Sequence, residues 1–271
     1  FEWLVDLSLN PDFDEYTAER KIARYALATL FYSTEGEGWE QNTNWLSTAD
    51  ECDWFTTRQQ SSCLNGELVA LELDNNNVQG ELPIEISLLT SLTSLSLRNP
   101  ANSRTLIQGS LPSSLGALSA LTALTISGNK FAGGIPLDIG KLSRLETLDL
   151  SSNELSSDIP FTFKALSKLT FLSLRQNRLT GGVPSDLLRS ATRLVQLHLD
   201  GNSFTSVPRE LRALNKLHVL NLANNELGFV PTGLFELTNL KSLDMSENSF
   251  GGTIPTQIGL MHGLTKLSLA S

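Results

Sequence analysis

Hydrophobic and polar residues follow one short pattern that recurs along most of the chain. The pattern is L-x-x-L-x-L-x-x-N, and its first copy starts at Leu68 and ends at Asn76. The later copies start, at spacings of 23 to 29 residues, at Leu92, Leu121, Leu145, Leu169, Leu194, Leu217, Leu240 and Leu264. A fixed period of this length indicates a repeat architecture, in which each unit buries its apolar side against its neighbours.

Each copy predicts a short strand with one buried face, because the leucines of L-x-L alternate with polar residues. Nine such strands stacked in parallel would form a curved sheet roughly 38 Å long. The ninth position is an asparagine in most copies: Asn76, Asn129, Asn153, Asn177, Asn202, Asn225 and Asn248. A buried amide there can bond backbone groups that a turn leaves unpaired, so we expect the asparagines to form an internal ladder.

The second half of most repeats carries the motif G-x-[apolar]-P, as in Gly80-Glu81-Leu82-Pro83 and Gly133-Gly134-Ile135-Pro136. Together with the strand pattern, this motif resembles the plant-type leucine-rich repeat of receptor-kinase ectodomains and polygalacturonase-inhibiting proteins. Ser157 replaces the glycine in the fourth repeat, and the sixth and seventh repeats are shorter and lack the motif. The resemblance implies an α/β leucine-rich-repeat solenoid, with a parallel sheet on the concave face and an irregular or 3-10 helical convex side.

The segment before Leu68 predicts a helical cap. Residues 15–33 have apolar positions at helical spacing, which are Ile22, Tyr25, Ala26, Thr29 and Leu30, and Gly36 and Gly38 follow. The string Trp45…Cys52-Asp53-Trp54…Cys63 resembles the N-terminal cap of plant-type repeats, and the run from Ala26 to Trp39 resembles caps of algal, especially diatom, leucine-rich-repeat proteins. We therefore divide the chain into a flank and cap over 1–67 and nine repeats over 68–271, the last one truncated.

The two cysteines, Cys52 and Cys63, lie eleven residues apart in one irregular segment of this cap. No further Cys or His is close enough in sequence to complete a tetrahedral metal site, so a disulfide is favoured over a metal site. Two free thiols in a cytosolic protein are the alternative. A disulfide indicates an oxidising compartment, so we expect a secreted or cell-surface protein.

The chain ends carry two further expectations. Phe1 to Asp6 have no basic region and no cleavage site, so they are not a signal peptide, and no stretch of 18 apolar residues predicts a membrane segment. The sequence stops at Ser271 inside the ninth strand. Because an open solenoid end exposes apolar surface, we expect a continuation or a partner to cover it.

The net charge of −9 lies entirely in the N-terminal segment. Residues 1–67 contain 13 acidic and 4 basic side chains, whereas residues 68–271 contain 16 of each. This balance argues against nucleic acid and against an anionic membrane surface as partners. The acidic run Asp12, Asp14 and Glu15 lacks the spacing of a calcium loop, so we expect a solvated face, no metal and no cofactor.

The exposed strand positions form columns on the concave face, and most of them are small and polar. Phe171 is the one aromatic residue in these columns, and its predicted neighbours are Asp149, Arg175, Gln196, His198, Asp200 and Asn221. An aromatic side chain with arginine and carboxylates around it has the composition of a binding hot spot. The alternative is one ordinary exposed ring.

A second candidate site is the insertion in the second repeat. Five extra residues lie near Arg98, Asn99 and Arg104, beside the concave face. Loops often carry recognition residues, although a tolerated surface insertion explains the segment equally simply.

A catalytic role is not expected. Asp149, Ser173 and His198 share one column, but the serine lies between the acid and the base, and a triad needs the base in the middle. We therefore expect an extracellular recognition module that binds a protein, peptide or glycan on its concave face. The alternative is a structural subunit that self-associates, which the bland concave face and the absence of N-x-[ST] sequons favour.

Overall fold

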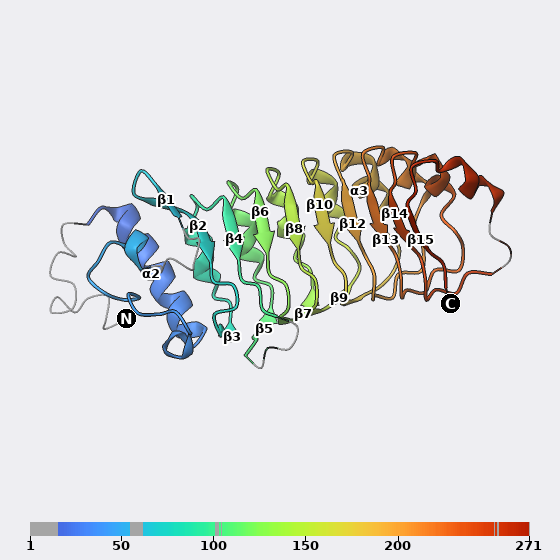
Figure 1. Cartoon of the computed structure of the whole chain (residues 1–271). Helices are drawn as coiled ribbons and strands as arrows, with labels where there is room; N and C mark the ends of the chain where they lie inside the picture. The colour runs from blue at the N-terminus through green and yellow to red at the C-terminus, as the bar shows by residue number, and fades with distance from the viewer. Residues whose placement is uncertain are drawn as a thin grey trace.

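The computed structural model describes residues 16–54, 62–100, 103, 105–251, 253 and 255–270, and it forms one solenoid (Figure 1). A ten-stranded sheet has the order β1-β2-β4-β6-β8-β10-β12-β13-β14-β15. Its parallel members are β2 (Glu67–Glu72), β4 (Ser94–Ser96), β6 (Ala123–Thr125), β8 (Thr147–Asp149), β10 (Phe171–Ser173), β12 (Gln196–His198), β13 (Val219–Asn221), β14 (Ser242–Asp244) and β15 (Lys266–Ser268). The nine predicted repeat strands are confirmed.

The central leucine of each strand is aligned with the central leucine of the next, as Leu71 with Leu95 and Leu148 with Leu172. These side chains are buried and belong to one continuous core that runs through the cap and the repeats. Full burial stabilises a leucine side chain by about 1.5–3 kcal/mol, so stacking neighbouring repeats is the main source of stability.

The predicted asparagine ladder is present. Asn153 illustrates its geometry: its Oδ1 accepts the N–H of Phe131 at 3.1 Å, and its Nδ2 donates to the carbonyl of Ile126 at 2.8 Å. The other ladder asparagines from Asn129 to Asn248 bond the preceding repeat in the same way. Each asparagine thereby ties its own repeat to the previous one.

A second, five-stranded parallel sheet was not predicted. It has the order β11-β9-β7-β5-β3 and comprises β3 (Gly80–Glu81), β5 (Ile107–Ser110), β7 (Lys130–Gly134), β9 (Glu154–Ser157) and β11 (Arg178–Leu179). Three of these strands, β3, β5 and β7, contain the glycine of the G-x-[apolar]-P motif, at which φ is positive, as at Gly80 (90°) and Gly133 (79°). Ser157 takes the same left-handed conformation with φ at 66°. The last strand of this sheet is β11 in the fifth repeat, and the sixth and seventh repeats, which follow it, lack the motif.

The convex side consists of short helical turns, as predicted. They are η4 (Ile84–Leu88), η5 (Ser113–Ala117), η6 (Leu137–Lys141), η7 (Phe161–Ala165), α3 (Ser185–Ser190), η8 (Arg209–Ala213), η9 (Thr232–Glu236) and η10 (Thr256–Leu260). A proline precedes each turn, with φ between −57° and −75°. The proline ring fixes φ and removes a backbone donor, so the preceding strand stops there.

The predicted cap helix is α2 (Ala18–Ser33), and the Thr17 side chain caps it by accepting the N–H of Arg20. Its buried face differs from the predicted one, because Ile22 is 45% exposed whereas Arg24 is fully buried. Arg24 tolerates burial because it forms an ion pair with Glu51, which lies in η3 (Glu51–Asp53). The helix therefore turns a charged residue, rather than Ile22, toward the interior.

The cap extends the asparagine ladder on the N-terminal side of β2, the first repeat strand. The short helix η2 (Gly36–Gly38) leads to Gln41, whose N–H donates to Asn76 Oδ1 at 2.7 Å, so the cap provides the first rung of the ladder. The predicted disulfide joins Cys52 and Cys63, with their Cα atoms 5.9 Å apart. Cys63 lies in β1 (Ser62–Leu64), an unpredicted strand that pairs antiparallel with β2 and covers the N-terminal edge of the sheet.

No helix in the described ranges combines the length and apolar character that crossing a membrane requires.

Candidate functional site

The predicted concave columns are confirmed by the strand register. Ser173 is aligned with Asp149 on one side and with His198 on the other, and His198 is aligned with Asn221. Phe171 is aligned with Gln196 one column away. The seven predicted site residues therefore lie on the adjacent strands β8, β10, β12 and β13 or in the residues that directly follow β10 and β12.

Phe171 and His198 form the centre of this group. Their ring centroids are 5.6 Å apart with an interplanar angle of 42°, and both side chains are partly exposed. Gln196 is adjacent, with its Oε1 3.3 Å from His198 Nε2. The flat side chains thus form an apolar platform with a hydrogen-bonding edge on an otherwise polar sheet.

Arg175 and Asp200 form an ion pair beside this platform, with 3.5 Å between Arg175 Nε and Asp200 Oδ2. The Arg175 side chain is 45% exposed, whereas that of Asp200 is only 12% exposed. Burial raises the pKa of Asp200, and the Arg175 guanidinium partly offsets this effect. Asp200 Oδ1 is buried and has no hydrogen-bond partner among the described residues, so the site holds one unsatisfied acceptor.

The other two predicted site residues, Asp149 and Asn221, each use one side-chain oxygen to accept a backbone N–H two residues further along the chain. Asp149 Oδ1 accepts the N–H of Ser151 at 3.0 Å, and Asn221 Oδ1 accepts the N–H of Ala223 at 3.1 Å. These local bonds fix the side chains on the strand surface and leave further polar atoms of each group facing the concave side.

His198 is expected to titrate below its ordinary pKa of 6.5, because burial lowers the pKa and Arg175 adds to this, against the opposing effects of Asp200 and Asp149. The contribution of His198 to stability is present above pH 6.5 and is lost as the pH falls through its folded-state pKa.

Imidazole proton shifts followed by NMR measure the pKa of His198 directly. Arg175→Gln should raise the pKa of His198 and Asp200→Asn should lower it further; a His198 pKa at or above 6.5 in the unmodified protein would contradict this.

The column Asp149–Ser173–His198 does not have the geometry of a triad. Ser173 is only 2% exposed and lies between the other two residues, and the His198 ring contacts Gln196 Oε1. Within the described ranges, no group of three or more His, Cys, Asp or Glu side chains is arranged to hold a metal ion. A triad needs the base between the nucleophile and the acid, and this column does not have that order.

The insertion in the second repeat differs from the predicted secondary site. Arg98 is exposed, but its backbone N–H and guanidinium both interact with Asp74, at 2.8 Å and 3.8 Å. Asn99, a predicted residue of this site, is only 5% exposed and donates to Asn129 Oδ1 at 2.9 Å. Pro100 stands at the ninth position of this repeat, and the neighbouring Asn99 bonds forward to the ladder residue Asn129. Arg104 lies outside the described residues, as does the acidic run before Glu19.

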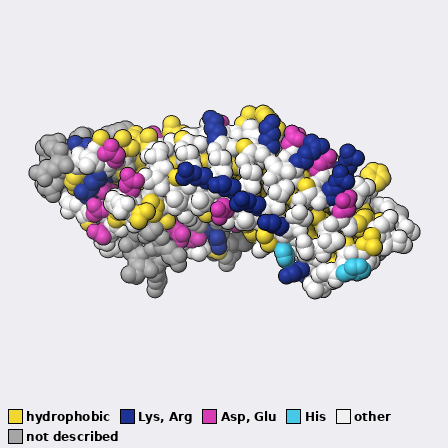
Figure 2. Space-filling view, turned by 90° about the horizontal axis from the view of Figure 1, so that it is seen from above, with side chains coloured by type: hydrophobic (Ala, Val, Ile, Leu, Met, Phe, Trp, Pro, Cys, Tyr) yellow, Lys and Arg dark blue, Asp and Glu magenta, His cyan; other side chains and the backbone are white. Residues whose placement is uncertain are grey.

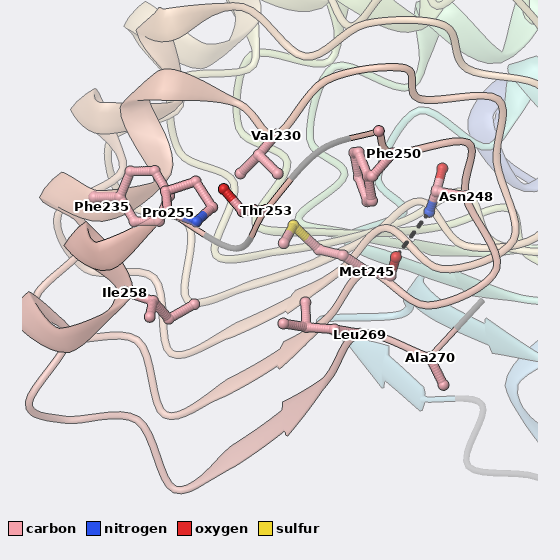
Figure 3. Close-up of a pocket in the computed structure, with 11 residues that line it drawn as sticks. Val230, Phe235, Met245, Asn248, Phe250, Thr253, Pro255, Ile258, Leu269 and Ala270 are labelled. Carbon is pink, nitrogen blue, oxygen red and sulfur yellow. Dashed lines mark hydrogen bonds between the residues drawn. The ribbon is translucent and has the colours of Figure 1, made fainter.

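A pocket of about 180 Å³ lies in the last repeats (Figure 3). Apolar side chains from both sides of the solenoid line it, including Met245, Phe250 and Leu269, and Asn248 donates to the Met245 carbonyl at its edge. These are interior positions of the repeat. The pocket therefore belongs to the packing of the solenoid and is separate from the concave group.

Comparison with protein-family models gives matches to the leucine rich repeat. One model matches residues 143–204, 192–250 and 215–271, and a second matches residues 120–142. Together these matches span residues 120–271, which is more than half of the chain. No curated protein matches the sequence.

Several solved structures are similar to the chain. The Arabidopsis receptor kinase HAESA, in complex with the peptide hormone IDA and the co-receptor SERK1, has a TM-score of 0.76 and 29% identity, over 93% of this chain and 41% of that one. The ectodomain of the Arabidopsis thaliana receptor kinase GASSHO1/SCHENGEN3, in complex with CASPARIAN STRIP INTEGRITY FACTOR 2, has a TM-score of 0.67 and 26% identity, over 91% and 35%.

A plant ice-binding protein has a TM-score of 0.54 and 23% identity, over 91% of this chain and 95% of that one, and this similarity concerns the fold alone. The chain spans less than half of the length of the two receptor ectodomains.

Proposed function

This chain belongs to the leucine-rich-repeat family, and we propose that it is a non-catalytic extracellular recognition module that binds an extended peptide or protein segment on its concave face. The observation that carries the proposal is the pair of Phe171 and His198 in the middle of a face of mostly small polar residues. Buried aromatic contacts supply much of the binding energy at interfaces, whereas small polar side chains add complementarity.

The charges beside the pair suit a peptide. Arg175 is 45% exposed and offers donors to a peptide carboxylate or carbonyl, and the Asp200 carboxylate lies beside it. The platform and the two charges lie on the two neighbouring repeats that contain β10 and β12.

Two further observations support an extracellular recognition role. The disulfide between Cys52 and Cys63 is typical of oxidising compartments. The receptor ectodomains to which the chain is similar are in complexes with a peptide hormone and with CASPARIAN STRIP INTEGRITY FACTOR 2.

The proposal predicts that Phe171→Ala weakens peptide binding by about 30-fold, equivalent to about 2 kcal/mol, as at an interface hot spot. The probe is a peptide selected from a random dodecapeptide display library on the unmodified chain, and its affinity is measured by calorimetry. Phe161→Ala is the matched control, because Phe161 is 63% exposed on the convex side.

Equal affinities of the Phe171→Ala and Phe161→Ala variants would contradict the site, as would a library that yields no peptide dependent on His198.

A further inference from the structure

A row of basic side chains runs along the border where the concave strands begin. Arg144, Lys168, Arg193 and Lys216 each directly precede the first leucine of four consecutive repeats. Lys241 and Lys266 lie two and three positions further along in the eighth and ninth repeats, after the first leucine. All six side chains are exposed, and we call this row the basic ridge. Figure 2 shows a line of Lys and Arg side chains along this side of the molecule.

The backbone holds the ridge residues at a regular spacing. Just inside the ridge, the N–H of Val195 donates to Thr170 O and the N–H of His218 donates to Val195 O, both at 2.8 Å. The N–H of Lys241 donates to His218 O at 2.9 Å, which extends the same ladder. Neighbouring strands are about 4.8 Å apart, so the six repeats that carry these cations span roughly 24 Å, with Lys266 inside the sheet opposite Ser242.

The ridge cations differ in their partners from several cations on the convex helices. On the convex helices, Lys141 pairs with Asp138, Arg189 with Asp186 and Glu210, and Arg212 with Glu236. Within the part of the chain that the structure describes, no ridge cation has a carboxylate within 4.0 Å.

Neighbouring residues do not compensate for the charge of the ridge. The positions directly inside it are Glu146, Thr170, Val195 and His218, so one carboxylate accompanies the row. Like charges on adjacent strands repel and destabilise a sheet, so this arrangement has a cost in the free protein. A row of uncompensated cations also creates a local positive potential that attracts a linear polyanion, although the chain as a whole carries −9.

We propose that the basic ridge binds an acidic polysaccharide, whose sulfate or carboxylate groups contact successive repeats. The site is distinct from the Phe171 platform and does not depend on it. A nucleic acid fits less well, because neither the ridge nor the positions directly inside it contain a Phe, Tyr or Trp on which a base could stack. The disulfide of the cap places the chain in compartments where acidic polysaccharides are available.

The test uses a fluorescent heparin oligosaccharide twelve sugars long and follows its anisotropy as the whole chain is added. The variant Arg144→Gln, Lys168→Gln, Arg193→Gln and Lys216→Gln should bind at least about tenfold more weakly, with a shallower dependence of affinity on salt. The matched control removes four cations from the convex helices: Lys141→Gln, Lys164→Gln, Arg209→Gln and Arg212→Gln. It should lose about twofold at most, since only the net charge changes.

Two further arms separate the alternatives. Arg144→Lys with Arg193→Lys keeps the charges and should retain heparin affinity, whereas Phe171→Ala should leave it unchanged. Equal weakening by the two quadruple variants would overturn the proposal. Competition by neutral dextran would overturn it too, and an oligothymidylate of equal charge that binds more tightly than heparin would assign the ridge to nucleic acid instead.

Discussion

Replacing Arg24 with methionine is expected to lower the free energy of unfolding of the cap by about 3–5 kcal/mol, the cost of leaving a buried charge without its partner. The Arg24 side chain is fully buried, and Glu51, its partner, is 8% exposed. Arg24 Nη1 also donates to the carbonyl of Ala49 at 3.1 Å, and Nη2 donates to that of Ser47. Methionine fills a similar volume but satisfies none of these acceptors.

The loss of stability in the cap can be followed through its aromatic cluster. The Arg24 guanidinium lies 4.8 Å from the Trp54 ring centroid, and Trp54, Trp45, Trp39 and Phe31 pack in sequence at 4.8 to 5.6 Å. Tryptophan fluorescence during urea unfolding therefore reports on this part of the molecule. Hydrogen exchange is the second measurement, because a repeat protein can lose its cap before the rest unfolds.

The double variant Arg24→Met with Glu51→Gln is the control. Because the glutamine carries no charge, the double variant should be more stable than the sum of the two single effects predicts. Glu51 also pairs with Arg20 at 2.9 Å, so part of the loss should remain. Strict additivity of the two single substitutions would show that the ion pair is not the source of the stability.

Replacing Asn129 with alanine is expected to destabilise the second and third repeats by about 3 kcal/mol, because each buried group left unpaired costs about 1–3 kcal/mol. The Asn129 side chain accepts from Ile107 N and from Asn99 Nδ2, at 3.1 and 2.9 Å, and donates to Leu97 O at 2.8 Å. These partners lie on both sides of the five-residue insertion, so Asn129 holds the two ends of that loop together.

Hydrogen exchange followed by mass spectrometry should show faster exchange of the amides of Leu97 to Ile107 in Asn129→Ala than in the unmodified chain. Lys130→Ala is the matched control, because Lys130 is the next residue and is exposed, and its effect should stay within about 0.5 kcal/mol. Unchanged exchange in Asn129→Ala would mean that the ladder does not anchor the insertion.

The fold could be predicted to a large extent from the sequence. The period of the leucines fixed the number of repeat strands and their register, because a one-residue shift would turn every leucine such as Leu148 to the solvent side. The same register predicted that Phe171, Gln196 and His198 lie beside one another, as they do. The disulfide between Cys52 and Cys63 followed from the cap motif and is present.

Other features depended on partners that are distant in the sequence. The burial of Arg24 requires Glu51, 27 residues away, and helical periodicity alone favoured Ile22 for the interior. Asn99 was assigned to a loop because the repeat motif breaks at Pro100, yet Asn129, 30 residues away, draws its side chain into the ladder. The basic ridge was overlooked because the charges of residues 68–271 sum to zero.

The sequence by itself thus determined the repeat, the register and the concave columns of this protein, since alternation of apolar and polar positions is a local property that stacking simply copies from one repeat to the next. Only the tertiary structure decided which polar groups are buried, which charges are paired and which are left without partners. Those outcomes depend on the distance between atoms of different repeats, because both the cost of burying a polar group and its relief by a partner vary over a few ångströms.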